Sequence, residues 1–187
     1  MSNGTTNLVA DGSFYEHHTP RAVFKWSEDS LLLASPIDGL AFYDGKKFSY
    51  WDIPVSDFIV ENRLYSGAQV AHDLFALGTQ NAGVIMMNRK GEVQQLINKS
   101  NGLQNNMVFN IKQDYHDNLW LALANGISFI NLNSPFSYYT EYTSIPRQNY
   151  YVTKHEGNLY FSNDAGVYSK PWKDVSSELT LNKAELV

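Results

Sequence analysis

The chain has 187 residues, 43% of them hydrophobic, and a net charge of −5. This mild acidity, without a run of basic residues, argues against nucleic-acid binding by this segment. The chain has no cysteine, and no apolar run is long enough to insert in a membrane.

In chain order, residues 1–13 are predicted to be a leader or loop, and residues 14–187 a propeller segment. Phe14 to Pro20 includes His17-His18. Adjacent residues of a strand point to opposite faces, so this pair alone makes a poor chelate, and we expect no metal and no cofactor. Short alternating or apolar runs bounded by turn residues then predict strands throughout the chain. In blade two, residues 58–60 and 68–71 are both candidate strands, with the second preferred as the inner one.

One pattern recurs four times. An apolar run and a turn lead to a glycine at Gly39, Gly83, Gly126 and Gly166, every 40 to 44 residues. Such a period, with four short strands per unit, predicts an all-β fold with almost no helix, a partial β-propeller of about four four-stranded antiparallel blades. The blades are expected at residues 21–56, 57–98, 105–142 and 149–175, with a break at Pro135 before a last strand at residues 137–142. A β-sandwich with recurring hairpins is the alternative.

The second place of each apolar run carries a large side chain: Leu32, Phe75, Trp120 and Tyr160. Trp120 is predicted to be a core residue, because neighbouring blades cover both faces of a blade. An aspartate precedes the run at Asp29, Asp73 and Asp117. These residues and Asp114 are expected to bond the backbone of their own turns.

The residues from blade two into blade three carry a family resemblance. The stretch GLQNNMVFNIKQDYHDNLWLALANGISFINLNS resembles the repeat of bacterial two-component-regulator propellers. Residues 53–172 are similar to the sensor region of Bacteroidetes regulators with triple-tyrosine and often helix–turn–helix domains. Asp117 stands where that family prefers Gly, and Ala122-Leu123 where it prefers Gly-Thr. The missing triple-tyrosine module implies a fragment of a sensor.

The resemblance implies a periplasmic location, as part of a membrane-anchored regulator, and a glycan-derived signal. A cytoplasmic location is the alternative. The implied partners are a carbohydrate or other small ligand and the remaining blades and output domain of a parent chain. Four blades of a longer propeller would leave two apolar faces uncovered and favour homo-oligomers; a closed four-bladed ring is the competing arrangement.

No catalytic motif stands out, so we expect a non-enzyme. His72, His116 and His155 precede the second strands of three blades, and we interpret them as solvated turn residues. The binding candidates lie in amide-rich loops between strands two and three and between blades, because amides both donate and accept hydrogen bonds. They are Gln80, Asn81, Asn125, Asn163, Asp164, Arg147 and Tyr150, with the stretch from Asn101 to Asn106 nearby and Tyr151 and Tyr139 as further stacking residues. A protein-interaction scaffold and a propeller lyase are the alternative functions.

Overall fold

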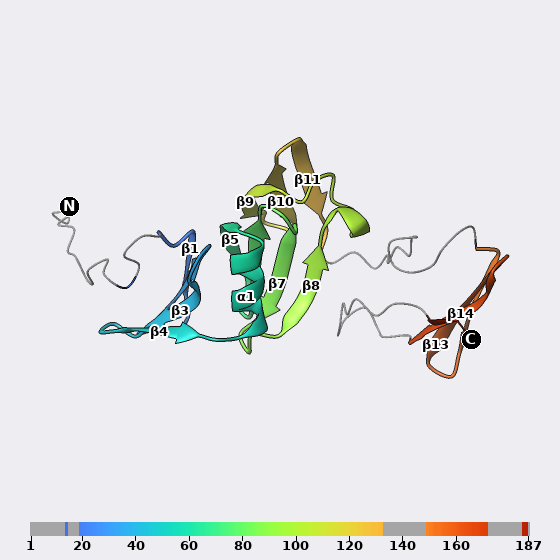
Figure 1. The fold of residues 1–187 in the computed structure, drawn as a ribbon, viewed down its shortest axis with the longest axis horizontal. Coiled ribbons are helices and arrows are strands. Elements are labelled where there is room, and N and C mark those ends of the chain that lie inside the picture. The colour runs from blue at the N-terminus through green and yellow to red at the C-terminus, as the bar shows by residue number, and fades with distance from the viewer. Residues whose placement is uncertain (1–13, 15–18, 133–148, 172–184, 187) are drawn as a thin grey trace.

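The protein is all-β and forms a partial propeller, which confirms the predicted fold class (Figure 1). The computed structural model describes residues 14, 19–132, 149–171 and 185–186. Their strands form three four-stranded sheets and one three-stranded sheet, all antiparallel, which we call blades one to four.

Blade one contains β1 (Ala22–Lys25), β2 (Leu31–Ser35), β3 (Gly39–Tyr43) and β4 (Phe48–Trp51). Helix α1 (Pro54–Glu61) leads to blade two, with β5 (Leu64–Ala71), β6 (Leu74–Thr79), β7 (Val84–Asn88) and β8 (Val93–Ile97). The 3₁₀ turn η2 (Lys99–Asn101) precedes blade three, with β9 (Val108–Gln113), β10 (Leu119–Leu123) and β11 (Gly126–Ile130). Blade four contains β12 (Tyr151–His155), β13 (Asn158–Asn163), β14 (Gly166–Pro171) and β15 (Glu185–Leu186). The strand predicted at residues 137–142, Pro135 and the His17-His18 pair lie outside the described residues.

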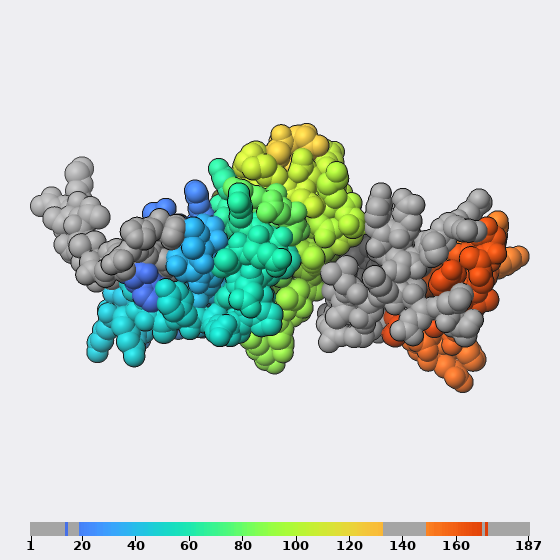
Figure 2. Space-filling view, viewed as in Figure 1, coloured from blue at the N-terminus to red at the C-terminus, as the bar shows by residue number. Residues whose placement is uncertain are grey.

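Blades one to three stack face to face around their first strands. Strand β5 contacts both β1 and β9. One core cluster joins blades one and two around Phe24, Leu32 and Phe75, and a second joins blades two and three around Met86 and Leu121. In Figure 2 the three blades accordingly form one continuous body. Burial of these faces supplies the main driving force for the arrangement.

The four repeat glycines occupy equivalent places, as predicted. Gly39, Gly126 and Gly166 each begin the third strand of their blade, and Gly83 directly precedes it. All four have positive φ, from 75° to 144°. This conformation is costly for residues with a Cβ, which explains why the pattern repeats glycine.

Helix α1 corrects the prediction of a strand at residues 58–60. Pro54 occupies the first turn, where its fixed φ suits a helix, and Asp57 lies near the positive end of the helix dipole. Val55 and Ile59, one turn apart, are fully buried between blades one and two. The Ser56 hydroxyl donates to the Trp51 carbonyl oxygen at 2.5 Å and accepts from the Leu40 amide at 3.3 Å. The helix is thus an integral part of the interface between the blades.

The prediction that Trp120 is a core residue is wrong. Its side chain is 45% exposed, on the face of blade three that points away from blade two, beside Phe129 at 51% exposed. Its neighbours Leu119 and Leu121 are fully buried on the opposite face. Adjacent strand residues point to opposite faces, so a core on one side of the blade leaves Trp120 on the other.

Both ends of this three-blade stack expose apolar side chains. On blade one Val23 is 56% and Tyr50 57% exposed, although the Phe14 ring stacks 4.7 Å from Phe48 and 4.6 Å from Tyr50. Within the described residues β1 pairs with β2, and no pairing to blade four is present. None of the described helices is long and apolar enough to cross a membrane.

Candidate functional site

The loops between second and third strands lie on one side of the blades together with the connections between blades, and we call this side the loop face. The amide of Gln80 donates to the carbonyl oxygen of Arg63 at 3.0 Å. The amide of Gly83 donates to the Asn106 oxygen at 2.9 Å, and that of Ala124 to the Met107 oxygen at 3.2 Å. Backbone bonds therefore position the loops of blades two and three on this face.

Three predicted residues present polar side chains on the loop face. Gln80 is half-buried, and Asn81 and Asn125 are exposed. The backbone amides of Gln80 and Asn81 donate to the Asn62 carbonyl at 3.1 and 3.3 Å, while their side-chain amides make no hydrogen bond to described residues. The backbone thus holds the loop in place and leaves the side chains available to a ligand.

The predicted residues of blade four form a separate group. The Tyr150 amide donates to the Ser162 oxygen at 2.9 Å, which places Tyr150 at the same end of the blade as the turn with Asn163 and Asp164. The Asn163 side-chain oxygen accepts from the Ala165 amide at 2.9 Å, a turn contact. Tyr150 and Tyr151 are 61% and 80% exposed. Arg147 and Tyr139 lie outside the described residues.

Most asparagines between blades two and three serve the backbone rather than a ligand. The Asn101 side chain donates to the Leu96 oxygen at 2.6 Å and accepts from the Asn98 amide at 2.6 Å. The Asn106 side chain accepts from the Lys99 amide at 2.8 Å, and Asn105 from the Met107 amide at 2.9 Å. These side chains cap a turn, as Asn commonly does.

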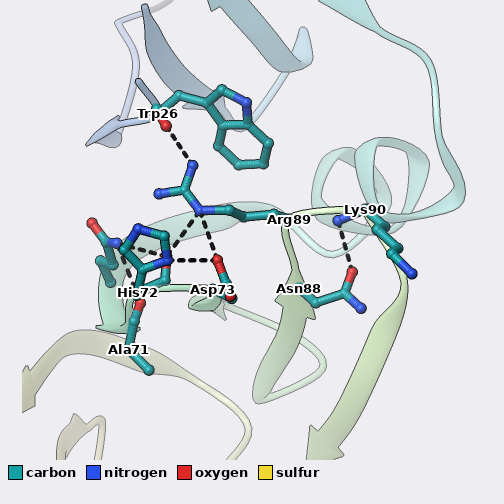
Figure 3. A network of polar contacts seen from close by, with 8 residues as sticks. Trp26, Ala71, His72, Asp73, Asn88, Arg89 and Lys90 are labelled. Atoms are coloured by element: carbon teal, nitrogen blue, oxygen red, sulfur yellow. Dashed lines mark hydrogen bonds and ion pairs between the residues drawn. The ribbon is translucent and has the colours of Figure 1, made fainter. Parts of the chain in front are cut away.

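Arg89, which the repeat pattern did not indicate, connects blades one and two on the opposite side of the blades (Figure 3). Its Nε donates to the His72 carbonyl oxygen at 2.9 Å and lies 3.1 Å from an Asp73 carboxylate oxygen. A terminal nitrogen donates to the Trp26 carbonyl oxygen, and the guanidinium lies 4.8 Å over the Trp26 ring and 5.6 Å from the centre of Phe75. Because Nε bonds blade two and a terminal nitrogen bonds blade one, Arg89 is a structural staple between the two blades.

The turn before β10 is organised by Asp114. Its carboxylate accepts from the Trp120 indole N–H at 3.0 Å and from the backbone amides of His116 and Asn118 at 2.9 and 3.0 Å. These bonds, first that of Trp120, hold the pKa of Asp114 well below its ordinary value of 3.8. Asp114 thus bonds its own turn, as predicted, and also fixes the exposed indole.

The three histidines that precede second strands lie apart from one another, each in a different blade. His72 and His116 lie in the first turns of blades two and three, and His155 ends β12 just before the first turn of blade four; His72 pairs with Asp73 and His155 with Glu156. Among the residues that the structure describes, no group of three metal-binding side chains comes together.

A second set that the repeat pattern did not indicate lies where the first strands begin. The Arg21 guanidinium lies 5.2 Å over the Tyr65 ring, and the Tyr65 ring packs edge-on against Phe109 with centroids 5.3 Å apart. The three residues come from three blades, so only the folded stack brings them together.

Comparison with known proteins adds fold-level evidence. No protein-family model and no curated protein matches the chain. Its structure is similar to the extracellular domain of BT3049, named as a hybrid two-component system of B. thetaiotaomicron, with a TM-score of 0.57 and 18% identity over 88% of this chain and 22% of that chain. It is also similar to the extracellular domain of BT4673, named as a one-component system of the same organism, with a TM-score of 0.50 and 19% identity over 95% of this chain and 25% of that chain. At this identity the likeness shows a shared fold, and the chain spans a quarter or less of those two chains.

Proposed function

We propose that the chain is an extracytoplasmic ligand-sensing segment of a bacterial signal-transduction or transcription regulator. The observation that carries the proposal is the fold similarity to two extracellular domains of regulatory systems across 88% and 95% of this chain. The resemblance of residues 53–172 to regulator propeller repeats supports the same class. In this proposal the segment is periplasmic, and its partners are the remaining blades and the output domain of a longer chain.

The signal we propose is a glycan-derived molecule. Gln80, Asn81 and Asn125 present side-chain amides on the loop face without partners among the described residues. An amide offers two donors and an acceptor, which matches the hydroxyl groups of a sugar. Tyr150 adds an exposed aromatic ring at the corresponding end of blade four.

We propose binding rather than catalysis. A lyase needs an acid and a base that converge on one substrate, whereas His72, His116 and His155 belong to three separate blades. A protein-interaction scaffold is the second candidate, because Trp120 and Phe129 expose an aromatic surface on blade three. Such a scaffold would engage this surface and leave the loop face unused.

Oligosaccharide binding to the chain tests the proposal, with calorimetry on each glycan that is retained in an array. We expect replacement of Gln80, Asn81 and Asn125 by alanine to weaken binding at least about tenfold, or about 1.4 kcal/mol. Gln95→Ala is the matched control, because Gln95 lies on the outer strand of blade two. Glycan binding that survives the triple replacement would place the ligand elsewhere, and loss of a protein partner on Trp120→Ala alone would favour the scaffold.

A further inference from the structure

The first strands of blades two and three carry the same irregularity at the same place. In blade two Leu64 pairs with Thr79 and Ser66 with Gly78, so Tyr65 is an extra residue without a partner. In blade three Val108 pairs with Leu123 and Asn110 with Ala122, so Phe109 is the extra residue. A β-bulge of this kind turns a side chain out of the regular ladder, and bulges are frequent beside functional sites.

Blades one and four continue the series by their hydrogen bonds. The Arg21 amide donates to the Ala34 oxygen at 2.8 Å while the next residue, Ala22, is the partner of Ala34. In blade four the Tyr150 amide donates to the Ser162 oxygen while Tyr151 is the partner of Ser162. The equivalent places therefore hold Arg21, Tyr65, Phe109 and Tyr150, one in each blade.

In the three-blade stack these side chains form a continuous row, which we call the bulge row: Arg21, Tyr65 and Phe109. Arg21 is exposed, Tyr65 is half-buried and Phe109 is 39% exposed, so a ligand can reach all three. The row adjoins the loop face, because the residues just before Tyr65 accept the backbone bonds of Gln80. Aromatic surface beside a few polar groups is the usual composition of a small-molecule site.

The row carries a positive charge at Arg21. Among the described residues no carboxylate forms an ion pair with Arg21 or with Arg63, two residues before Tyr65. Arg63 also holds a left-handed φ of 56°, which is uncommon for a residue with a side chain. In a chain of net charge −5, these two exposed guanidinium groups favour an anion, since neither pairs with a carboxylate of the described residues and that of Arg21 lies over the Tyr65 ring. The guanidinium fork matches two oxygens of a carboxylate or sulfate.

We propose that the bulge row binds an acidic saccharide, with the anionic group on Arg21 and a sugar ring against Tyr65 and Phe109. The inference rests on the proposed ligand-sensing function and names the ligand class more narrowly.

Nuclear magnetic resonance of the chain with three simple probes tests this proposal. The probes are sodium galacturonate, galactose 6-sulfate and galactose, each raised to roughly 50 mM so that weak binding is detected. We expect the Arg21 Nε–H signal and the ring signals of Tyr65 and Phe109 to shift with one or both of the acidic sugars, and much less with galactose. The Nε–H signal of the staple residue Arg89 serves as an internal control and stays in place. The two acidic probes distinguish a carboxylate from a sulfate as the recognised group.

Two replacements that each remove one positive charge distinguish binding at a specific site from general electrostatic attraction of an anion to the protein. Arg21→Gln is expected to weaken binding of the acidic sugar about tenfold, because it removes the fork that holds the anion. Lys112→Gln removes one exposed positive charge from β9 and is expected to leave binding unchanged. Phe109→Leu is expected to weaken the binding of acidic and neutral sugars alike, because it removes an aromatic ring and no charge.

Three results would overturn the proposal: no shift in the bulge row with either acidic sugar, equal shifts with galactose, or unchanged binding by the Arg21→Gln variant. Equal binding of acidic and neutral sugars would be compatible with the proposed ligand-sensing function and would contradict only the proposal that the ligand is acidic. Conversely, a cytoplasmic location of the segment would remove the proposed function while the sugar titration could still succeed.

Discussion

Replacing Phe75 and Trp120 by alanine should have very different consequences, although both occupy the second place of an apolar run. Phe75 is fully buried, with the Phe24 ring centroid at 5.1 Å and that of Trp26 at 5.4 Å. An emptied aromatic site costs about 3–5 kcal/mol, and the lost ring contacts add to it, so we expect about 4–5 kcal/mol for Phe75→Ala.

The corresponding cost at Trp120 is small because 45% of the side chain is already exposed. Half of the burial energy of an aromatic residue is about 1 kcal/mol, and the edge contact with Phe129 at 5.0 Å adds about 0.5–1 kcal/mol. We therefore expect about 1–2 kcal/mol for Trp120→Ala, roughly 3 kcal/mol less than for Phe75→Ala.

Urea unfolding followed by circular dichroism measures this difference. With a urea dependence of about 2 kcal/mol per molar, the two midpoints should differ by roughly 1.5 M. Equal midpoints would show that Trp120 is covered as fully as Phe75. A Phe75→Ala variant as stable as the parent would refute the packing of blade one against blade two.

Three further predictions address the turns and the staple. Gly83→Ala should lower the free energy of unfolding by more than about 3 kcal/mol, because the added Cβ would stand 2.1 Å from a backbone oxygen. Gly157→Ala, with open space around it, should lower it by about 1 kcal/mol, so similar urea midpoints for the two variants would contradict this reasoning. Arg89→Met should cost about 1–3 kcal/mol, because the Trp26 carbonyl oxygen loses the Arg89 donor and the His72 carbonyl oxygen keeps only the Gln69 side-chain amide; a change below about 0.5 kcal/mol would show that Arg89 does not hold the two blades together. The pKa of Asp114 in the folded protein lies below its ordinary value of 3.8, so the stability that its carboxylate contributes is present above pH 3.8 and is lost as the pH falls through the lower folded pKa. Trp120 fluorescence should therefore stay constant from about pH 5 to about pH 3. A transition centred at the ordinary pKa would contradict the hydrogen bond between Trp120 and Asp114.

Strand positions and the repeat glycines could be predicted because they depend on local features. Alternation, apolar runs and the need for positive φ are all visible within ten residues of chain. The direction of each side chain was harder to predict. Gly78 and Ala122 hold the same place in their blades, each opposite the residue that follows the bulge, but five residues separate Gly78 from its partner Val84 and four separate Ala122 from its partner Ile127. Matching the apolar runs by order therefore pairs Phe75 with Trp120, although their true positions differ by one residue. A shift of one residue exchanges the faces of a strand, and these two side chains point to opposite sides of their blades.

Helix α1 was missed because eight residues are too few to show a helical period, and its apolar residues also fit a strand. The signal was present in Pro54, which suits the first turn of a helix, followed by the i, i+4 pair Val55 and Ile59.

Some residues of the candidate site could be predicted from local sequence, whereas others depend on contacts between distant parts of the chain. The amide loops could be predicted from composition, although only the structure separates the open side chains of Gln80 and Asn81 from the turn-capping Asn101. The bulge row could not be predicted, because a bulge depends on the partner strand and the contact between Arg21 and Tyr65 joins two blades.

The most direct test of the proposed function is the side of the membrane on which this segment lies in the bacterial cell. The chain has no cysteine, and Tyr115 is fully exposed in a turn, so Tyr115→Cys introduces one accessible thiol within the segment. In cells whose outer membrane has been made permeable, a maleimide that cannot cross the inner membrane should label the peptide containing residue 115, as detected by mass spectrometry. Labelling only after the inner membrane is broken would place the segment in the cytoplasm and contradict an extracytoplasmic sensor.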